Sequence, residues 1–551
     1  MNELVVKMAK QAYQQPLLDS GLWFHDDIRD NFYYASYLFA YAAGSRPEEN
    51  DEIEAGHAVA VASGVLLRVL SLQNRNREDE RYGHWPLRLG SDLAQAAANP
   101  LPAEIMGSLM VYFYKRFASM LPEKLKLAFE DAFAHLHNAD YYKVPMNIYN
   151  HHEAKYTASK LIFGELFQDE KLLEDGRRSL QLTLERLERQ GMPEYSALPW
   201  YWHWIQAFTC ALECVTDSSL KDELRELLNY LWEERAAVYL QGAWAGGRMR
   251  SLPHDLPTDK NIAFDYIQFG DIALPSGRLP RVEYAGLLFY DAGERIRSLA
   301  LNRTVPYERK VKITPAGSSG REAKPPLHSY LYMTGQYAAG GIWERAREFD
   351  NEQHRWEVAF PLHMADGGAN RLYAFQPGDG YREGDPRHQN DNGEMLFCEN
   401  AIIAHYPAIP ERDGKLIGVL PKGTWRKGDK GLYGRLNGGV YVAVYVERAY
   451  TVLEESDRLA LEIEGGNSWN TVVVEALDEA ELREYRSDVM DLDGFAHTME
   501  QRKPLIDQAG SSEVSISYET WRGHSLRLKV MGQSIIERTI NGNTVQFNEY
   551  K

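Results

Sequence analysis

The spacing of apolar residues changes once along this chain of 551 residues, and that change limits its fold more than any other feature. Up to about residue 300, apolar side chains recur every three or four positions, as at Leu220, Leu224 and Leu227, which is the period of an amphipathic helix. Later segments such as 439–446 alternate or are continuously apolar, which is typical of sandwich strands. Because the chain is too long for one ordinary core, we predict two domains, the first all-helical and the second an antiparallel β-sandwich.

Residues 1–301 predict a helical domain. Helical periodicity is found at 30–43, 53–72, 102–120, 124–137, 152–167, 201–215 and 285–301, and around Leu173, Leu180, Leu184 and Leu187. Ser219 and Asp222 fit a capping box at the start of a further helix. Many helices in sequential hairpins favour a toroid or solenoid, and the sequence has no fixed-length repeat of the kind that regular helical arrays show. We therefore expect an (α/α) toroid.

Residues 302–327 are predicted to be a linker, because 314–320 is rich in Gly, Ser and Pro. Residues 328–551 then predict the β-sandwich. Short strands are expected at 356–360, 439–446, 459–463, 471–475, 514–518, 526–530 and 535–540. Asn541-Gly542 is a hairpin turn signal before a strand at 544–547.

The charge balance excludes some classes of partner. The chain has 61 Lys and Arg against 79 Asp and Glu, a formal net charge of −18. This acidity argues against nucleic-acid binding, which needs a basic face, and against attraction to anionic membranes. An acidic polysaccharide would also be repelled by the average surface, so binding one requires a local basic patch.

The three cysteines, Cys210, Cys214 and Cys398, are too few for a disulfide framework and are expected as buried thiols. The sequence has no C-x-x-C pattern, and we expect neither a cofactor nor a metal. The first twenty residues contain no continuous apolar run of the kind that signal peptides need. A cytoplasmic location is the resulting expectation.

The first polar cluster, 147–153, stands at the start of a predicted helix. Asn150 can be the N-cap of that helix. Two adjacent histidines, His151 and His152, are not needed for capping. The positive end of a helix also suits a carboxylate ligand, so this segment is either a cap or part of a site.

The second cluster runs from Glu194 and Tyr195 to an aromatic segment, Trp200-Tyr201-Trp202-His203-Trp204. The segment is either a packed helix start or a sugar-binding wall, because aromatic faces pack against the apolar faces of pyranose rings.

The third cluster, 245–255, contains Arg248, Arg250 and His254 after two glycines. It is either a solvated surface loop or the basic patch that an anionic substrate requires. Two further segments are less specific. Residues 26–33 are expected to cap a helix and could line a cleft, and Gln353-His354 could project towards the helical domain.

This organisation resembles the heparinase II/III-like and alginate-lyase-like polysaccharide lyases over most of the chain. Asn150-His151-His152 is similar to the Asn/His segment of these lyases, and Glu194-Tyr195-Ser196 to a Glu-Tyr-Asn-Ser type of element. Ala245-Gly246 with Arg250 resembles an Ala-Gly-Pro-His-Ser-Arg element, and 334–341 resembles the start of the family's sandwich region.

The resemblance implies a lyase that cleaves a uronic-acid-containing oligosaccharide or polysaccharide by β-elimination. Asn150 and His152 would neutralise the substrate carboxylate and Arg250 would orient it. Tyr195 or Tyr201 would be base or acid, although an unperturbed tyrosine pKa is about 10, with His203 and His254 as alternative proton carriers. The remaining candidates for substrate binding are His151, Glu194, Trp200, Trp204 and Arg248.

Two other functions fit the same sequence. A glycoside hydrolase on a helical toroid needs two carboxylates flanking the scissile bond, and Glu194, Asp30, Asp255 and Asp265 are available. A non-catalytic carbohydrate-binding protein would bind sugar without forming product.

Overall fold

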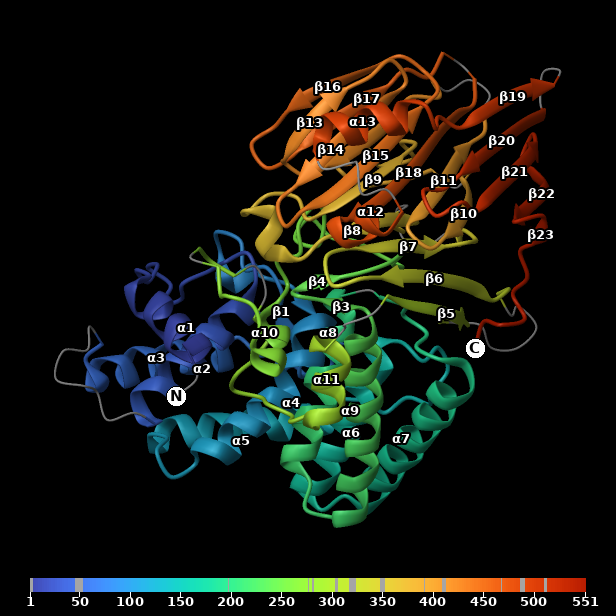
Figure 1. Ribbon diagram of the computed structural model, residues 1–551. Helices are drawn as coiled ribbons and strands as arrows, with labels where there is room; N and C mark the ends of the chain where they lie inside the picture. The colour runs from blue at the N-terminus through green and yellow to red at the C-terminus, as the bar shows by residue number, and fades with distance from the viewer. Residues whose placement is uncertain are drawn as a thin grey trace.

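The computed structural model describes residues 3–44, 53–196, 198–275, 277–279, 282–302, 306–316, 324–346, 352–390, 392–408, 413–466, 468–485, 491–509 and 513–551. Helices fill one half of the molecule and sheets the other, and the chain passes from the first half to the second near residue 300 (Figure 1). The predicted fold class, a helical region followed by an antiparallel β domain, is confirmed.

The helical half is built from amphipathic and fully buried helices that pack on their sequence neighbours. They are α1 (Glu3–Gln14), α2 (Ile28–Gly44), α3 (Ala55–Ser71), α4 (Pro100–Phe117), α5 (Glu123–Asn138), α6 (His151–Phe167), α7 (Glu170–Gln190), α8 (Leu198–Cys214), α9 (Ser218–Ala237), α10 (Ala263–Phe269) and α11 (Gly293–Leu301). The predicted capping box is wrong in detail, because Asp217 is the N-cap of α9 and its side chain accepts from the backbone N of Leu220.

Two glycines set the close packing of α6 on α7. A Cβ at Gly176 of α7 would lie 2.8 Å from Cδ2 of Leu161, and one at Gly164 of α6 would lie 2.8 Å from the backbone N of Leu173. Because any larger residue would push the helices apart, glycine at these two positions fixes the distance between them.

The helical half closes on itself through segment 282–288, which follows α10. The Tyr37 hydroxyl of α2 donates to the carbonyl oxygen of Ala285 (2.7 Å), and Phe32 stacks on Tyr284 with ring centroids 5.5 Å apart. This return of a late segment to an early helix is what a toroid requires. None of the described helices is long and apolar enough to span a membrane.

Two large antiparallel sheets form the body of the β half. The strand order of one is β16-β17-β12-β9-β8-β7-β6-β5, and that of the other is β10-β11-β18-β15-β14-β13. Their bounds are β5 Tyr307–Ile313, β6 Leu327–Met333, β7 Ala338–Ile342, β8 Trp356–Ala359, β9 Arg371–Phe375, β10 Glu394–Cys398, β11 Ala401–Tyr406, β12 Leu416–Leu420, β13 Thr424–Lys427, β14 Gly431–Leu436, β15 Val440–Val446, β16 Tyr450–Glu454, β17 Leu459–Ile463 and β18 Asn470–Asp478.

The two sheets meet through buried aromatic side chains. The Trp356 indole of β8 donates to the hydroxyl of Tyr406 on β11 (2.8 Å), and Tyr330 of β6 stacks on Phe397 of β10 with centroids 6.0 Å apart. A smaller sheet, β19 to β23, packs beside them; its strands are Leu505–Ala509, Glu513–Glu519, Ser525–Met531, Ser534–Ile540 and Asn543–Thr544. Helices α12 (Glu479–Tyr485) and α13 (Leu492–Glu500) precede it.

The predicted linker needs correction. Part of segment 302–327 is β5, which pairs along its whole length with β6 and forms the edge of the larger sheet. Residues 303–305 and 317–323, which include most of the glycine- and serine-rich run, lie outside the described residues. The larger sheet therefore begins well before residue 328, and β5 lies on the side of the sheet that faces the helical half (Figure 1).

Candidate functional site

A cavity of about 630 Å³ lies at the N-terminal end of α6. It is lined by cationic side chains, by three histidines and by a single carboxylate among the described residues. The cationic residues are Arg29, Lys155, Arg250 and Lys324, the histidines are His151, His152 and His203, and the carboxylate belongs to Glu194. In a chain with a net charge of −18, this cavity is the local basic region that an anionic ligand needs.

Asn150 is both the cap of α6 and a wall of the cavity. Its Oδ1 accepts from the backbone N of His152 and of Glu153, both at 3.1 Å, which confirms the capping hypothesis. With Oδ1 used in this way, the Nδ2 amide is the group of Asn150 that can donate to a ligand.

His151 is held by Glu194 from a different segment. Glu194 Oε1 lies 2.6 Å from His151 Nδ1, and Oε2 accepts from the backbone N of His151 (2.6 Å) and from the Trp204 indole (2.8 Å). Because a carboxylate only accepts, we assign the ring proton to Nδ1. Burial lowers the pKa of His151 well below its ordinary value, so the ring is neutral near pH 7.

His152 is held in the same manner by Glu104 of α4. Its Nδ1 lies 2.7 Å from Glu104 Oε2, which also accepts from the Lys155 ammonium (2.7 Å), while Tyr156 donates to Oε1 (2.9 Å). Burial by itself would raise the pKa of Glu104, but the hydrogen bond from His152 and the charge of Lys155 lower it to about 2. Glu104 is therefore ionised and orients the imidazole.

His203 of α8 is the third member of this group. Its Nε2 lies 3.3 Å from Glu283 Oε1. The His151 ring centroid is 4.1 Å from that of His152 and 5.7 Å from that of His203. Three histidines, each paired with its own glutamate, thus meet at one cavity.

Trp200 positions two of the lining groups. The His151 ring is stacked on its indole at 4.8 Å with an interplanar angle of 5°, and the Arg250 guanidinium carbon lies 5.1 Å from the ring centroid. Arg250 also forms an ion pair with Glu352. In the structure, the Trp200 ring packs on His151 and on Arg250. The sugar-stacking role predicted for it stays a prediction.

A larger hollow of about 1060 Å³ adjoins the cavity and shares Asn150, His152 and Ile148 with it. Tyr82, Tyr141 and Tyr156 line this hollow, and all of the described residues that line it belong to the helical half. The hollow therefore continues the cavity past His152.

The two tyrosines predicted as base or acid do not lie at this cavity. Tyr195 and Tyr201 line a separate cavity between the domains. The buried Tyr201 hydroxyl donates to the Leu231 carbonyl oxygen, and burial raises its pKa well above the ordinary value. The Tyr195 hydroxyl accepts from Gln353 Nε2 at 2.8 Å, so Gln353 does project towards the helical half as expected.

Trp204 is completely buried and holds Glu194, so it does not form a sugar subsite.

The three residues of the expected basic patch do not lie together at the cavity. Arg248 is 0 % exposed, whereas Arg250 reaches the cavity. His254 lies outside the residues that line the cavity, and its Nε2 is 4.0 Å from Asp255 Oδ1.

Arg248 belongs to a buried ionic network that joins the two halves. Its guanidinium lies 3.7 Å from Asp259 Oδ1 and 3.6 Å from Glu357 Oε1, and Arg371 pairs with both of these carboxylates. Its backbone exchanges two hydrogen bonds of 2.9 Å with His354 before β8. Arg248 is a structural residue that holds the 245–250 segment against the larger sheet.

Several lining or supporting residues were not predicted. They are Glu104, Lys155, Glu283 and Lys324; Arg29 fell in the segment expected to cap a helix or line a cleft. Glu104 had a detectable signal, since it is a lone charge in an otherwise apolar stretch of helix, which indicates a buried and paired group. Among the described residues, no group of three or more His, Cys, Asp or Glu side chains is arranged to hold a metal ion.

Comparison with known proteins supports the fold. No protein-family model matches the sequence, and no curated protein matches it. The chondroitin AC lyase of Streptomyces coelicolor A3, solved with chondroitin sulphate, matches with a TM-score of 0.50 and 9% identity, over 96% of this chain and 87% of that one.

Two further solved structures are similar at lower scores. The heparan sulfate lyase HepC of Pedobacter heparinus has a TM-score of 0.38 and 10% identity over 99% of this chain and 90% of that one. A heparinase III has a TM-score of 0.41 and 9% identity over 96% and 91%. The likeness to the chondroitin AC lyase, at 9% identity, concerns the fold alone, a helical region followed by antiparallel sheets.

Proposed function

We propose that this protein is a lyase that cleaves a uronic-acid-containing glycan by β-elimination in the cavity at the start of α6. The observation that carries the proposal is the grouping of three histidine–glutamate pairs with Asn150 and Arg250 in one cationic cavity. The polysaccharide lyase fold supports it.

The reaction explains why such a cavity is useful. A base removes the proton on C5, next to the C6 carboxylate, and the C–H electron pair forms the C4–C5 double bond while the C4–O4 bond breaks. Because that proton is a very weak acid, charge that develops on the carboxylate must be stabilised by donors that are already in place.

In this proposal, groups around the N-terminal end of α6 bind the substrate carboxylate. The Asn150 amide, His152 and Arg250 line the cavity together, and Lys155 adds positive charge behind them. The positive end of the helix dipole favours an anion at the same place. We assign carboxylate neutralisation to Asn150, His152 and Arg250.

Proton transfer falls to His203, since the two tyrosines lie elsewhere. The ring of His203 lines the cavity, and its Nε2 lies 3.3 Å from Glu283 Oε1. The imidazolium that forms on proton removal is stabilised by Glu283 and can return its proton to the departing O4. Atoms and charge balance without any further reactant.

Among the described residues that line this cavity, there is no pair of carboxylates of the kind that the hydrolase alternative needs. Glu194 already accepts from His151 and Trp204. Asp265 forms an ion pair with Arg235, and Asp30 lies 3.5 Å from Arg278 in another hollow. Asp255 is fully buried, and its Oδ2 accepts from the backbone N of Leu252.

The experiment is a screen of unsulfated and sulfated glucuronate- and iduronate-containing oligosaccharides with ultraviolet detection of the unsaturated uronate. A lyase produces this chromophore, whereas a hydrolase produces reducing sugar without it and a binding protein produces neither. Turnover that gives reducing ends with no ultraviolet signal would replace the lyase proposal by the hydrolase.

A further inference from the structure

The segment that leads into α6 runs back along the helix and is held there by buried polar side chains. The Lys160 ammonium donates to the carbonyl oxygen of Val144 at 2.7 Å, and the Thr157 hydroxyl lies 3.6 Å from the Met146 sulfur. Glu153, one turn nearer the cavity, is the third of these residues. All three are at most 7 % exposed and follow the spacing of one helix face, so segment 144–149 is held against that face.

Glu153 binds three consecutive backbone N–H groups. Its Oε1 accepts from the backbone N of Asn147 and of Ile148, both at 2.9 Å, and its Oε2 accepts from Ile148 at 3.0 Å and from Tyr149 at 2.7 Å. Successive N–H groups that converge in this way form a nest for an anion. Because the protein's own carboxylate fills this nest, a substrate carboxylate has to bind elsewhere in the cavity.

The backbone conformation that Glu153 holds is an unusual one. Tyr149 has a φ of 59°, in the left-handed region that residues with a side chain rarely adopt. Among the described residues, Glu153 is the only hydrogen-bond partner of the backbone N atoms of Ile148 and Tyr149. Such a backbone persists only where its surroundings fix it, and residues of this kind cluster at functional sites.

Glu153 has the position of the glutamate in a capping box, three residues after Asn150, but it makes different contacts. In a capping box, the glutamate accepts from the backbone N of the cap residue. Here the backbone N of Asn150 has no hydrogen-bond partner in the described part of the chain, and Asn150 Oδ1 caps the helix. The backbone N–H and the Nδ2 amide of Asn150 therefore stay uncommitted at the cavity wall.

The segment that Glu153 holds is part of the wall of the cavity at the start of α6. Ile148 and Asn150 line both this cavity and the adjoining hollow, whereas Glu153 lines the hollow and is outside the residues that line the cavity. Glu153 can therefore act on a ligand in the cavity only through the residues whose backbone it binds.

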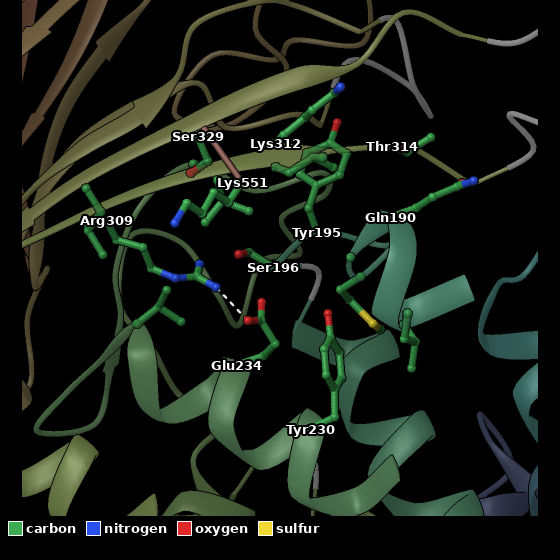
Figure 2. A pocket seen from close by; sticks show the side chains of 18 of the residues that line it. Gln190, Tyr195, Ser196, Tyr230, Glu234, Arg309, Lys312, Thr314, Ser329 and Lys551 are labelled. Atoms are coloured by element: carbon green, nitrogen blue, oxygen red, sulfur yellow. Dashed lines mark hydrogen bonds and ion pairs between the residues drawn. The ribbon is translucent and has the colours of Figure 1, made fainter. Parts of the chain in front are cut away.

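A second segment of the cavity wall, 194–196, is held by several partners. The backbone N of Met249 donates to the carbonyl oxygen of Tyr195 at 3.0 Å, and Gln353 donates to the Tyr195 hydroxyl at 2.8 Å. The far side of this segment faces the cavity between the domains (Figure 2). By comparison, the backbone just before Asn150 depends on the carboxylate of a single residue.

We propose that Glu153 is a positioning residue, which holds 147–149 in place so that Asn150 presents its donors to the substrate carboxylate. The part that Asn150 has in β-elimination rests on the proposed function, whereas the hold of Glu153 on the segment rests on its hydrogen bonds alone. A negative charge near an anionic substrate weakens binding, so an effect of Glu153 through its charge would have the opposite sign to an effect through positioning.

The test combines hydrogen exchange with kinetics on three variants. Glu153→Gln removes the charge and one acceptor oxygen, Glu153→Asp keeps the charge but shortens the reach by one methylene, and Asp140→Asn is the matched control. Asp140 lines the same hollow, but its side chain is 91 % exposed and pairs with Lys143. Mass spectrometry follows exchange in 147–150, and the ultraviolet signal gives kcat and KM on the uronate oligosaccharide that the wild type cleaves fastest in the screen above.

We expect exchange at 147–149 to be at least about tenfold faster in Glu153→Gln, because these N–H groups lose their shared acceptor. Its kcat should fall about 10- to 100-fold through misplacement of Asn150, with KM within about threefold of the wild type. Glu153→Asp should show the same pattern to a smaller degree, and it carries the test if Glu153→Gln does not fold. Asp140→Asn should match the wild type in exchange and in kinetics.

Unchanged exchange in Glu153→Gln would overturn the hold on the segment, and faster exchange with unchanged kcat would overturn the positioning role. A lower KM with unchanged kcat, or an equal loss of kcat in Asp140→Asn, would show an effect of charge alone and contradict the proposal as well. A wild type that forms no unsaturated product contradicts the lyase proposal, and the exchange measurement then tests the hold of Glu153 by itself.

Discussion

His151 and Glu194 are joined at two points, because one carboxylate oxygen lies 2.6 Å from the ring Nδ1 and the other accepts from the backbone N at 2.6 Å. Glu194 thereby fixes both the ring and the main chain of the first residue of α6. A third donor, the Trp204 indole, holds the carboxylate in place. The N-terminal end of α6 is therefore tied to the segment that leads into α8.

We expect Glu194→Gln to lower kcat about 10- to 100-fold, since an amide has one acceptor oxygen for three donors and hydrogen bonds to a charged group contribute about 1.5–3 kcal/mol. Steady-state kinetics on the ultraviolet signal give kcat and KM, and circular dichroism checks the fold. Glu185→Gln, at an exposed position of α7, is the matched control. Unchanged kcat in Glu194→Gln would show that the pair has no part in turnover.

His203→Gln is expected to lower kcat/KM by about 10²–10⁴-fold, which is the usual contribution of a general base or acid. His254→Gln should retain activity within a few-fold, because His254 lies outside the cavity lining. Initial rates of both variants on the same substrate test which of the two histidines transfers the proton. A larger loss in His254→Gln than in His203→Gln would reverse the assignment.

Arg248 and Arg250 should respond differently to replacement by Met. Arg248→Met leaves Asp259 and Glu357 buried with Arg371 as their remaining close arginine, and breaking such a network costs about 3–5 kcal/mol. Arg250→Met should raise KM with a much smaller loss of thermal stability. Thermal unfolding and KM are measured for both, and equal melting temperatures would contradict the buried network.

The low pKa of Glu104 predicts that its contribution to stability depends on pH. Its pKa is about 2 in the folded protein against an ordinary value of 4.5, so its stabilisation is complete above about pH 4.5 and is lost as pH falls towards 2. We expect Glu104→Gln to melt below the wild type at pH 7, and the gap to narrow as pH falls from 4.5 to 3.5. Glu123→Gln, at an exposed position of α5, is the control. A gap that stays constant over this window would contradict the assigned pKa.

Two glycine-to-alanine changes should have opposite signs. Gly176→Ala places a methyl group 2.8 Å from Leu161 and should cost about 1–3 kcal/mol through overpacking. Gly64→Ala in α3 meets no atom within 4 Å and should stabilise by about 0.5–1 kcal/mol, because alanine favours the helix. Melting temperatures of the two variants test the α6–α7 packing, and a stabilised Gly176→Ala protein would refute it.

Local sequence patterns predicted the elements whose stability is itself local. The strand expected at 459–463 is β17, and Asn541-Gly542 forms the predicted hairpin turn with φ values of 53° and 76°. Strand β5 was missed because three consecutive charged residues, Glu308 to Lys310, interrupt the strand pattern. Its pairing comes only from β6, beyond the Gly- and Ser-rich segment.

By itself the sequence determined the order of helical and β domains, the helix cap at Asn150 and the segments that carry polar chemistry, because periodicity and capping depend on neighbours in the chain. Only the tertiary structure decided which side chains of those segments meet. It brought His151, His152 and His203 together with glutamates from three other segments, buried Arg248, and turned Tyr195 to a different cavity from Glu194. Adjacent residues can face opposite sides of one backbone segment, and which side becomes a cavity depends on packing partners that are distant in the sequence.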